Sequence, residues 1–170
     1  TRTGVIEILK QMGADITVQN ERIAGGEPIA DIRIQGTRTL KGIHMPEDQV
    51  PLAIDEFPSL FIVAACAEGQ TILTAAAELR VKESDRIQVM ADGLKTMGID
   101  CTPTEDGIII EGKGKAGEWG AIFAGGEIES HHDHRIAMSF SMAGLRSSGE
   151  IKIVGTETVA TSFPTFTELT

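Results

Sequence analysis

The run of charged residues from Leu79 to Arg86 has the residue types and the spacing for chemistry on an anion. Glu83 and Arg86 are three residues apart, and Lys82 and Arg86 are four apart, so a helix would project all three to one side. At the start of such a helix, unpaired N–H groups would add to the attraction for an anion. The run therefore indicates a phosphate or carboxylate site, and a solvated, salt-bridged helix start capped by Ser84 is the alternative interpretation.

A second charged group, His131-His132-Asp133-His134-Arg135, precedes a stretch with helical periodicity. His131 and His134 have a spacing that can bind zinc, but no Cys lies nearby and the His outside this group, His44, is distant in the sequence, so the sequence predicts no metal site. Asp133 is expected to cap the helix, which places His134 and Arg135 in its first turn. A cation there opposes the helix dipole unless an anion binds at the same end, so Arg135 is a candidate for anion binding.

The segment Asp55-Glu56-Phe57-Pro58 opens another expected helix. Asp55 as the helix cap, with Pro58 in the first turn, is a sufficient structural account of the segment. A carboxylate held at a helix N-terminus beside a cationic site can also act as a general base on a hydroxyl. The two interpretations are compatible, so Asp55 is a candidate for both.

Alternating helices and strands must position these three groups. Apolar periodicity predicts helices at residues 3–12, 55–67, 84–97 and 133–145, the second of them buried on most sides. Apolar runs predict strands at residues 15–18, 32–34, 71–73, 108–110, 126–130 and 151–154, with another expected at 40–44. Gly13, Gly69 and Gly98 are expected to end helices, and a further helix is expected to open at Ser162.

An internal repeat organises these elements. Six residues of the segment 9–17 recur 85 positions later in the segment 94–102, and a looser match relates the helices that start at 55 and 133. The repeated order is strand, helix, strand, helix, strand, strand, in a unit of about 80 residues. We expect the end of one repeat at 1–39, a complete repeat at 40–112 and most of a third at 113–170. This order predicts a mixed α/β (α+β) fold.

The chain has 170 residues, with 15 Lys and Arg against 25 Asp and Glu, and a formal net charge of −10. This charge has the wrong sign for a general phosphate-backbone binder, so we expect no nucleic-acid partner. No apolar run approaches the roughly 20 residues of a membrane-spanning helix, so we expect no membrane segment. Cys66 and Cys101 form neither a CxxC pair nor a disulfide framework, which is typical of a reducing cytoplasm. The abrupt start at Thr1 and end at Thr170 indicate a fragment of a longer protein.

Five segments carry a resemblance to a known family: 1–4 (TRTG), 54–58 (IDEFP), 79–87 (LRVKESDRI), 133–140 (DHRIAMSF) and 161–166 (TSFPTF). In this order the chain resembles the 5-enolpyruvylshikimate-3-phosphate synthases (3-phosphoshikimate 1-carboxyvinyltransferases) over its whole length. The resemblance implies a two-domain enolpyruvyl transferase fold, in which each domain contains three βαβαββ units. The chain would be most of the C-terminal domain, and the missing N-terminal domain of the same chain would be its partner.

By this resemblance the full-length parent is a cytoplasmic transferase of the shikimate pathway and a glyphosate target. It would transfer the enolpyruvyl group of phosphoenolpyruvate to the 5-hydroxyl of shikimate 3-phosphate and release phosphate, with no cofactor and no metal. This reaction belongs to chorismate and aromatic amino acid biosynthesis. The isolated chain is expected to be inactive, because the contacts of the other domain and domain closure are absent.

The resemblance also implies residue roles. Asp55 is expected to be the general base near the 5-hydroxyl, and Glu83 the acid and base at the methylene carbon. Lys82 is expected to contact the bound hydroxyl or phosphate oxygens, as a catalytic and a binding residue. These residue types are the ones that the proton transfers of the reaction require.

Anion binding is implied for Arg86 and Arg135, which are expected to hold phosphoenolpyruvate with His134 close by. One position departs from the family pattern. Many members have Lys two residues before the Phe-Pro of the last motif, where this chain has Thr161, so a phosphate or carboxylate contact at this position is in question. With Thr161 at this position, the motif is similar to that of the second class of the family, some of whose members tolerate glyphosate.

Two other hypotheses are compatible with the residues. Enzymes of the same fold act on a nucleotide sugar or on an RNA 3′-phosphate end. The UDP-N-acetylglucosamine enolpyruvyl transferases usually carry a reactive Cys on a mobile loop, whereas Cys66 lies in an expected helix and Cys101 in an expected strand. The pairing of DEFP with KESDR favours the synthase. The other hypothesis is a non-catalytic α/β piece whose motifs are helix caps and ion pairs.

Overall fold

The structure, a computed structural model, describes residues 3–36 and 40–169, so the expected chain start at Thr1 and end at Thr170 lie outside the described residues. Within these ranges the helices are α1 (Gly4–Gln11), α2 (Phe57–Cys66), α3 (Arg86–Thr96), α4 (His134–Ala143), α5 (Glu157–Ser162) and α6 (Phe166–Leu169). The strands are β1 (Asp15–Ala24), β2 (Glu27–Gln35), β3 (Glu68–Leu73), β4 (Cys101–Pro103), β5 (Ile108–Lys113), β6 (Gly126–Glu129) and β7 (Ile151–Val154). The predicted mixture of helices and strands is confirmed.

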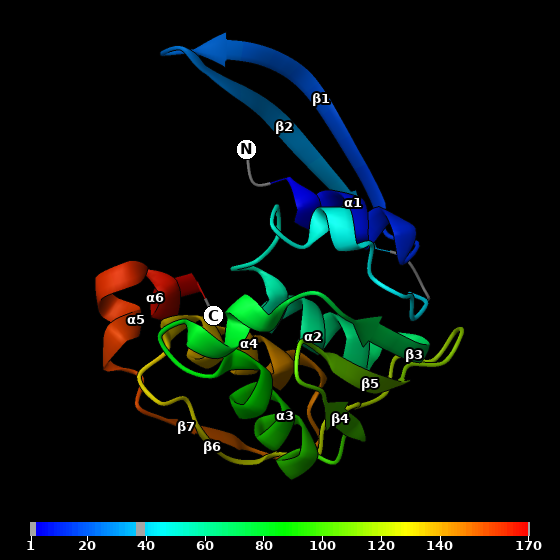
Figure 1. Cartoon of the computed structure of the whole chain (residues 1–170), viewed down its shortest axis with the longest axis vertical. Helices are drawn as coiled ribbons and strands as arrows, with labels where there is room; N and C mark the ends of the chain where they lie inside the picture. The colour runs from blue at the N-terminus through cyan, green and yellow to red at the C-terminus, as the bar shows by residue number, and fades with distance from the viewer. Residues whose placement is uncertain (1–2, 37–39, 170) are drawn as a thin grey trace.

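Strands β1 and β2 form a long antiparallel hairpin that extends away from the rest of the molecule (Figure 1). The strands predicted at 15–18 and 32–34 are confirmed, and both run further than predicted. The turn between them is Gly25-Gly26, with φ angles of 60° and 87° that glycine adopts without a steric penalty. The hairpin therefore lies apart from the helices that carry the charged segments.

Strands β3, β5 and β4 form an antiparallel sheet with β5 in the centre. The strands predicted at 71–73 and 108–110 are confirmed. The strand expected at 40–44 is wrong, because the backbone makes isolated parallel bridges to β3 at Lys41 and His44 rather than a continuous ladder. The helix stop expected at Gly69 is also wrong: α2 ends at Cys66, and Gly69 lies inside β3 with φ 87°.

The last strand pair, β6 and β7, is parallel, and α4 connects the two strands. The segment at 40–44 runs parallel to β3 in the same way, with α2 as the connection. The two connecting helices pack together, and Ser59 Oγ of α2 lies 3.1 Å from Ser139 Oγ of α4, 80 residues further along the chain. A segment parallel to a later strand, with a helix as the connection, therefore occurs twice, once around α2 and once around α4.

The core lies between α2, α3, α4 and the sheet of β3, β5 and β4 (Figure 1). Helix α2 is buried along most of its length, including Phe57 and Phe61, as predicted. Gly93 of α3 allows a close approach of α4, because a Cβ at this position would overlap the ring of Phe140. These three helices therefore hold one another in fixed positions.

Two repeat-equivalent strand pairs differ in burial. In the hairpin, Ile16 pairs with Ile34 and Val18 with Ile32, and the matching pair in the next repeat joins Cys101 to Ile110. Ile32 and Ile34 are 54% and 67% exposed, whereas Ile110 is 1% exposed because β3 and α2 cover β5. The hairpin therefore exposes apolar residues that its counterpart buries.

The C-terminal part differs from the prediction in one respect. The helix expected to open at Ser162 is wrong, because α5 ends at Ser162 and α6 begins at Phe166. Helix α5 packs against α4, and Thr158 Oγ1 donates a hydrogen bond to the carbonyl of His132 just before α4. No helix within residues 3–36 and 40–169 is both long enough and apolar enough to cross a membrane.

Candidate active site

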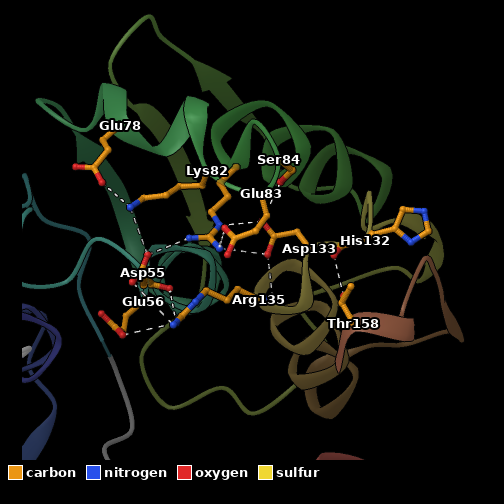
Figure 2. A network of polar contacts seen from close by, with 11 residues as sticks. Asp55, Glu56, Glu78, Lys82, Glu83, Ser84, His132, Asp133, Arg135 and Thr158 are labelled. Atoms are coloured by element: carbon orange, nitrogen blue, oxygen red, sulfur yellow. Dashed lines mark hydrogen bonds and ion pairs between the residues drawn. The ribbon is translucent and has the colours of Figure 1, made fainter. Parts of the chain in front are cut away.

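The charged segments predicted from the sequence meet at one place, where the N-terminal ends of α2, α3 and α4 converge (Figure 2). Asp55 precedes α2, Lys82 and Glu83 precede α3, and Arg135 lies in the first turn of α4. Arg86, the first residue of α3, lies at the centre of the contacts. The structure therefore brings together five of the six predicted site residues.

Helix α3 begins later than predicted, which changes how its charged residues reach the site. Asp85 caps the helix by accepting a hydrogen bond of 3.0 Å from the backbone N–H of Gln88, so the cap predicted at Ser84 is wrong. Lys82 and Glu83 lie in the loop between a 3₁₀ turn at Ala77–Val81 and α3, not on a helix face. The predicted helical spacing is therefore wrong for these two residues, although both still contact the cluster.

The guanidinium of Arg86 is fully buried and is held by three carboxylates. Its Nε donates to Asp133 Oδ2 at 2.8 Å, its Nη1 to Asp55 Oδ1 at 3.2 Å and its Nη2 to Glu83 Oε2 at 2.5 Å. Burial lowers the pKa of Arg86, but hydrogen bonding and the charge of Asp133, followed by the charges of Glu83 and Asp55, leave that pKa raised. Arg86 is therefore a permanent cation, and each of its three guanidinium nitrogens already donates to a carboxylate.

Asp133 joins three parts of the site. Its carboxylate is fully buried and accepts hydrogen bonds from Arg86 Nε, from Ser84 Oγ at 3.0 Å and from the backbone N–H of Arg135 at 3.0 Å. Burial raises the pKa of Asp133, but the bonds and charge of Arg86, with smaller contributions from Ser84 and the Arg135 N–H, leave it lowered. The predicted helix cap is confirmed, and its contacts to Arg86 and Ser84 were not predicted.

Asp55 faces three cations. Its carboxylate oxygens lie 3.2 Å from Arg86 Nη1, 3.7 Å from Lys82 Nζ and 4.0 Å from Arg135 Nη2. The alternative interpretation of Asp55 as the cap of α2 is wrong, because Glu56 occupies that position and makes no capping hydrogen bond with its side chain. The carboxylate of Asp55 therefore belongs to the charged cluster, a position that is compatible with the predicted role of general base.

Arg135 and Lys82 border the cluster on the solvent side. Arg135 Nη1 donates to the backbone carbonyl of Asp55 at 2.9 Å and lies 3.7 Å from Glu56 Oε1, and Lys82 Nζ donates to Glu78 Oε1 at 2.5 Å (Figure 2). The hydrogen bond to Glu78 raises the pKa of Lys82, so the amine is protonated at neutral pH. Both cations therefore bear a positive charge and have carboxylate neighbours.

His134 is the predicted site residue that the structure does not join to the cluster. It is the first residue of α4 and is half-buried, and no contact found in residues 3–36 and 40–169 links its ring to the charged cluster. Nδ1 of the nearby His132 lies 3.1 Å from Glu157 Oε2, on the side of α5. His134 is close to the site only through its position next to Arg135.

Residues that the sequence did not single out for the site are Asp133, Glu56, Glu78 and Ser84. Glu56 and its partner Arg135 are 79 positions apart, and Ser84 and Asp133 are 49 apart, so local spacing carried no signal for these residues. Glu78 lies only four residues before its partner Lys82. The one available signal concerned Asp133: a fully buried carboxylate needs a cation as its partner. The sequence alone did not show that Asp133 is buried. No cluster of three or more His, Cys, Asp or Glu suited to a metal occurs in the described parts of the chain.

In the described residues, three cations of the cluster face five carboxylates: Lys82, Arg86 and Arg135, against Asp55, Glu56, Glu78, Glu83 and Asp133. The cations are therefore neutralised locally, and an anionic ligand has to compete with protein carboxylates for them. Carboxylates at this density supply candidates for proton transfer, and the cations supply candidates for holding a carboxylate or a phosphate.

Comparison with known proteins gives a consistent result. The family described as EPSP synthase (3-phosphoshikimate 1-carboxyvinyltransferase) matches residues 1–169. The 3-phosphoshikimate 1-carboxyvinyltransferases of Methylococcus capsulatus and Hydrogenovibrio crunogenus are each 61% identical over 169 residues, 99% of this chain. A solved structure of EPSP synthase from Acinetobacter baumannii has a TM-score of 0.97 and 89% sequence identity over 99% of the chain.

Coverage of these proteins is partial. The chain spans 37% and 36% of the length of the two relatives and 38% of the solved chain. The resemblance inferred from the motifs is confirmed, together with the fold, which is part of a two-domain enolpyruvyl transferase. The match over residues 1–169 places the chain in its family: it belongs to the EPSP synthases.

Proposed function

We propose that the full-length protein carrying this chain transfers the enolpyruvyl group of phosphoenolpyruvate to the 5-hydroxyl of shikimate 3-phosphate and releases phosphate. The observation that carries the proposal is the convergence of Asp55, Lys82, Glu83, Arg86 and Arg135 at three helix N-termini. A non-catalytic protein would not need a cluster of cations around the solvent-accessible carboxylates of Asp55 and Glu83.

Asp55 is the proposed general base at the 5-hydroxyl. Its side chain is 23% exposed, so a substrate hydroxyl can reach it from solvent, and Lys82, Arg86 and Arg135 lie within 4.0 Å of its oxygens. Those cations surround the carboxylate that would accept the proton of the hydroxyl. As the 5-hydroxyl loses its proton, its oxygen becomes more negative, and these cations lie where they would stabilise that charge.

Glu83 is the proposed acid and base at the methylene carbon. Its side chain is 51% exposed and is attached to the loop before α3, so it can change rotamer without moving a helix. The carboxylate of Glu83 would first take up a proton from solvent, which its exposure allows. The resulting carboxylic acid would deliver this proton to the methylene carbon in the addition step, and the regenerated carboxylate would remove a proton from the methyl group in the elimination step. Asp55 and Glu83 approach the same guanidinium from two segments, which places the two proton-transfer groups on one site.

Lys82, Arg86 and Arg135 are the proposed anion-binding residues. Their charges suit the carboxylate and phosphate of phosphoenolpyruvate, and planar guanidinium groups can bind such groups through two parallel hydrogen bonds. His134 is retained as a proposed neighbour of this subsite because it precedes Arg135 in α4. Thr161 lies in α5 and donates to the carbonyl of Thr158 at 2.9 Å, so it supplies no cation at this position.

The domain organisation belongs to the same proposal. We place the end of one repeat at 1–39, a complete repeat at 40–112 and most of a third at 113–170, within a C-terminal domain that works with an N-terminal domain of the same chain. Phosphoenolpyruvate and shikimate 3-phosphate are the proposed ligands, and the pathway is that of chorismate. The two cysteines are free thiols, in agreement with a cytoplasmic location.

The decisive experiment measures phosphate release by the full-length protein with phosphoenolpyruvate and either shikimate 3-phosphate or UDP-N-acetylglucosamine as acceptor. Release with shikimate 3-phosphate alone is the expected result. Release with the nucleotide sugar alone would assign the protein to another enolpyruvyl transferase activity. Release with neither acceptor would mean that the cluster is a set of caps and ion pairs.

A matched pair of variants assigns the activity to the cluster. Asp55→Asn removes the proposed base, and Asp92→Asn makes the same change at an exposed position of α3 whose carboxylate accepts only from the neighbouring Gln88 among the contacts described. The first variant should lose most of the phosphate release, and the second should keep it. Equal activity of the two variants would refute the role of Asp55.

A further inference from the structure

The three carboxylates that hold Arg86 are not equally fixed. Asp133 is fully buried and is held by Ser84 and the N–H of Arg135, and Asp55 is 23% exposed and lies among three cations. Glu83 is 51% exposed, and its described contact is the single hydrogen bond to Arg86 Nη2. Glu83 is therefore the carboxylate that can leave the guanidinium at the lowest cost.

Arg86 cannot meet an external anion in the arrangement that the structure shows. Its side chain is 1% exposed, and Glu83, Asp55 and Asp133 occupy donors on all three guanidinium nitrogens. An anion that binds Arg86 has to take the place of one of these carboxylates. Removing Asp133 would uncap α4, and removing Asp55 would leave Lys82 and Arg135 without a shared partner, so neither exchange is favourable.

We propose that Glu83 is a displaceable latch on Arg86: an anionic group of the ligand takes over Arg86 Nη2, and the carboxylate of Glu83 swings out into the site. The exchange replaces one charge-assisted hydrogen bond by another of the same kind, so its net cost is small. The loop position of Glu83 lets the side chain rotate while α3 and Arg86 stay in place.

The latch rests on the proposed function and deepens it, because it links binding to the delivery of a proton-transfer group. Before binding, Glu83 is held against Arg86 and cannot point at a bound methylene carbon. After binding, the same anion that occupies Arg86 has released the carboxylate beside it. A ligand without an anionic group would leave Glu83 in place, so the latch selects anionic ligands.

The test is equilibrium binding of inorganic phosphate to the full-length protein, measured by isothermal titration calorimetry. Glu83→Gln removes the charged competitor, and we expect phosphate to bind about tenfold more tightly, as for loss of a charge-assisted hydrogen bond at a half-exposed position. Glu83→Asp keeps the charge but is one methylene shorter and cannot reach Nη2, so it should also bind phosphate more tightly than the wild type. Glu105→Gln is the control: the carboxylate is exposed, and Glu105 contacts Arg80 through its backbone carbonyl, which the substitution retains.

The outcomes separate displacement from a general effect of charge. Tighter binding by both Glu83 variants, with the control unchanged, supports the latch. Tighter phosphate binding in Glu83→Gln and Glu105→Gln, but not in Glu83→Asp, would show a general charge effect and would overturn the latch. Unchanged phosphate affinity in the Glu83 variants would also overturn the latch, and so would the absence of any phosphate binding. Phosphate binding needs no acceptor substrate, so the latch can hold even if release with shikimate 3-phosphate fails.

Discussion

Asp133→Asn is the substitution that tests the architecture of the site most directly. The new side chain has the same shape, and its amide oxygen can still accept from the N–H of Arg135, because Asn caps helices about as well as Asp. Its amide NH₂ then faces Arg86 Nε and Ser84 Oγ, which donate to Asp133 Oδ2 in the structure. The Ser84 hydroxyl can turn to accept from the new NH₂, but the Arg86 N–H would face another donor in a fully buried place, while α4 keeps its cap.

The size of the effect follows from these contacts. Removing one partner of a buried ion pair costs about 3–5 kcal/mol. Arg86 retains Asp55 and Glu83, and α4 retains its cap, so the lower end of that range applies. We therefore expect a loss of about 3 kcal/mol of local stability around α3 and α4, a large share of the ~5–15 kcal/mol that stabilises a typical protein.

Hydrogen–deuterium exchange of the full-length protein measures this loss locally. At pH 7, peptides that cover α3 and α4 should exchange about a hundredfold faster in Asp133→Asn, because each 1.4 kcal/mol corresponds to about a factor of ten. Peptides of the β1–β2 hairpin should be unchanged, since the hairpin lies apart from the site (Figure 1). Asp92→Asn, with the same chemical change at an exposed position of α3, should exchange like the wild type.

The pH dependence gives a second measurement. The pKa of Asp133 is lowered in the folded protein, so its contribution to stability is complete above the ordinary aspartate pKa of about 3.9 and disappears as the pH falls through the lowered value. The difference in urea midpoint between wild type and Asp133→Asn should be full at pH 7 and should shrink below about pH 4. Equal exchange of wild type and variant at pH 7 would refute the argument, because Asp133 would then not hold Arg86.

Three further predictions concern catalysis and packing. Glu83→Gln in the full-length protein should lower kcat far more than it changes the KM for phosphoenolpyruvate, measured by phosphate release; a change confined to KM would make Glu83 a binding residue only. The purified 170-residue chain should show no phosphate release with both substrates, because contacts from the rest of the protein and domain closure are absent; turnover would disprove this. Gly93→Ala should lower the thermal unfolding temperature, because overlap with the buried ring of Phe140 costs about 1–3 kcal/mol, more than the gain in helix propensity of up to about 1 kcal/mol; an unchanged or higher temperature would contradict the close packing of α3 on α4.

Sequence matching predicted the order of some elements. A match between segments 9–17 and 94–102 predicted that a helix and a following strand occur twice, and α1 with β1 and α3 with β4 have that order. Periodicity could not predict burial in the same way. Ile34 and Ile110 occupy comparable strand positions, but their exposure depends on covering elements that lie elsewhere in the chain.

Prediction of the helix starts was less successful because several polar residues competed for each cap. Ser84 and Asp85 are both good caps, and local sequence gave no reason to prefer one. In the structure Ser84 donates to Asp133, 49 residues away, and Asp85 is the residue left to cap α3. A long-range contact therefore decided a local feature. The same contact explains why Lys82 and Glu83 reach the site from a loop.

Asp55 and Asp133 precede two buried helices but make different contacts. Both residues precede the buried helix of their repeat, and Asp133 caps α4 as this position favours. Glu56 takes the cap position of α2 and makes no capping bond, although a good cap is worth about 1 kcal/mol. The carboxylate of Asp55 instead faces Lys82, Arg86 and Arg135. Departures from local preference are expected where a residue serves a site, and the position of the Asp55 carboxylate among three cations agrees with the role proposed for it.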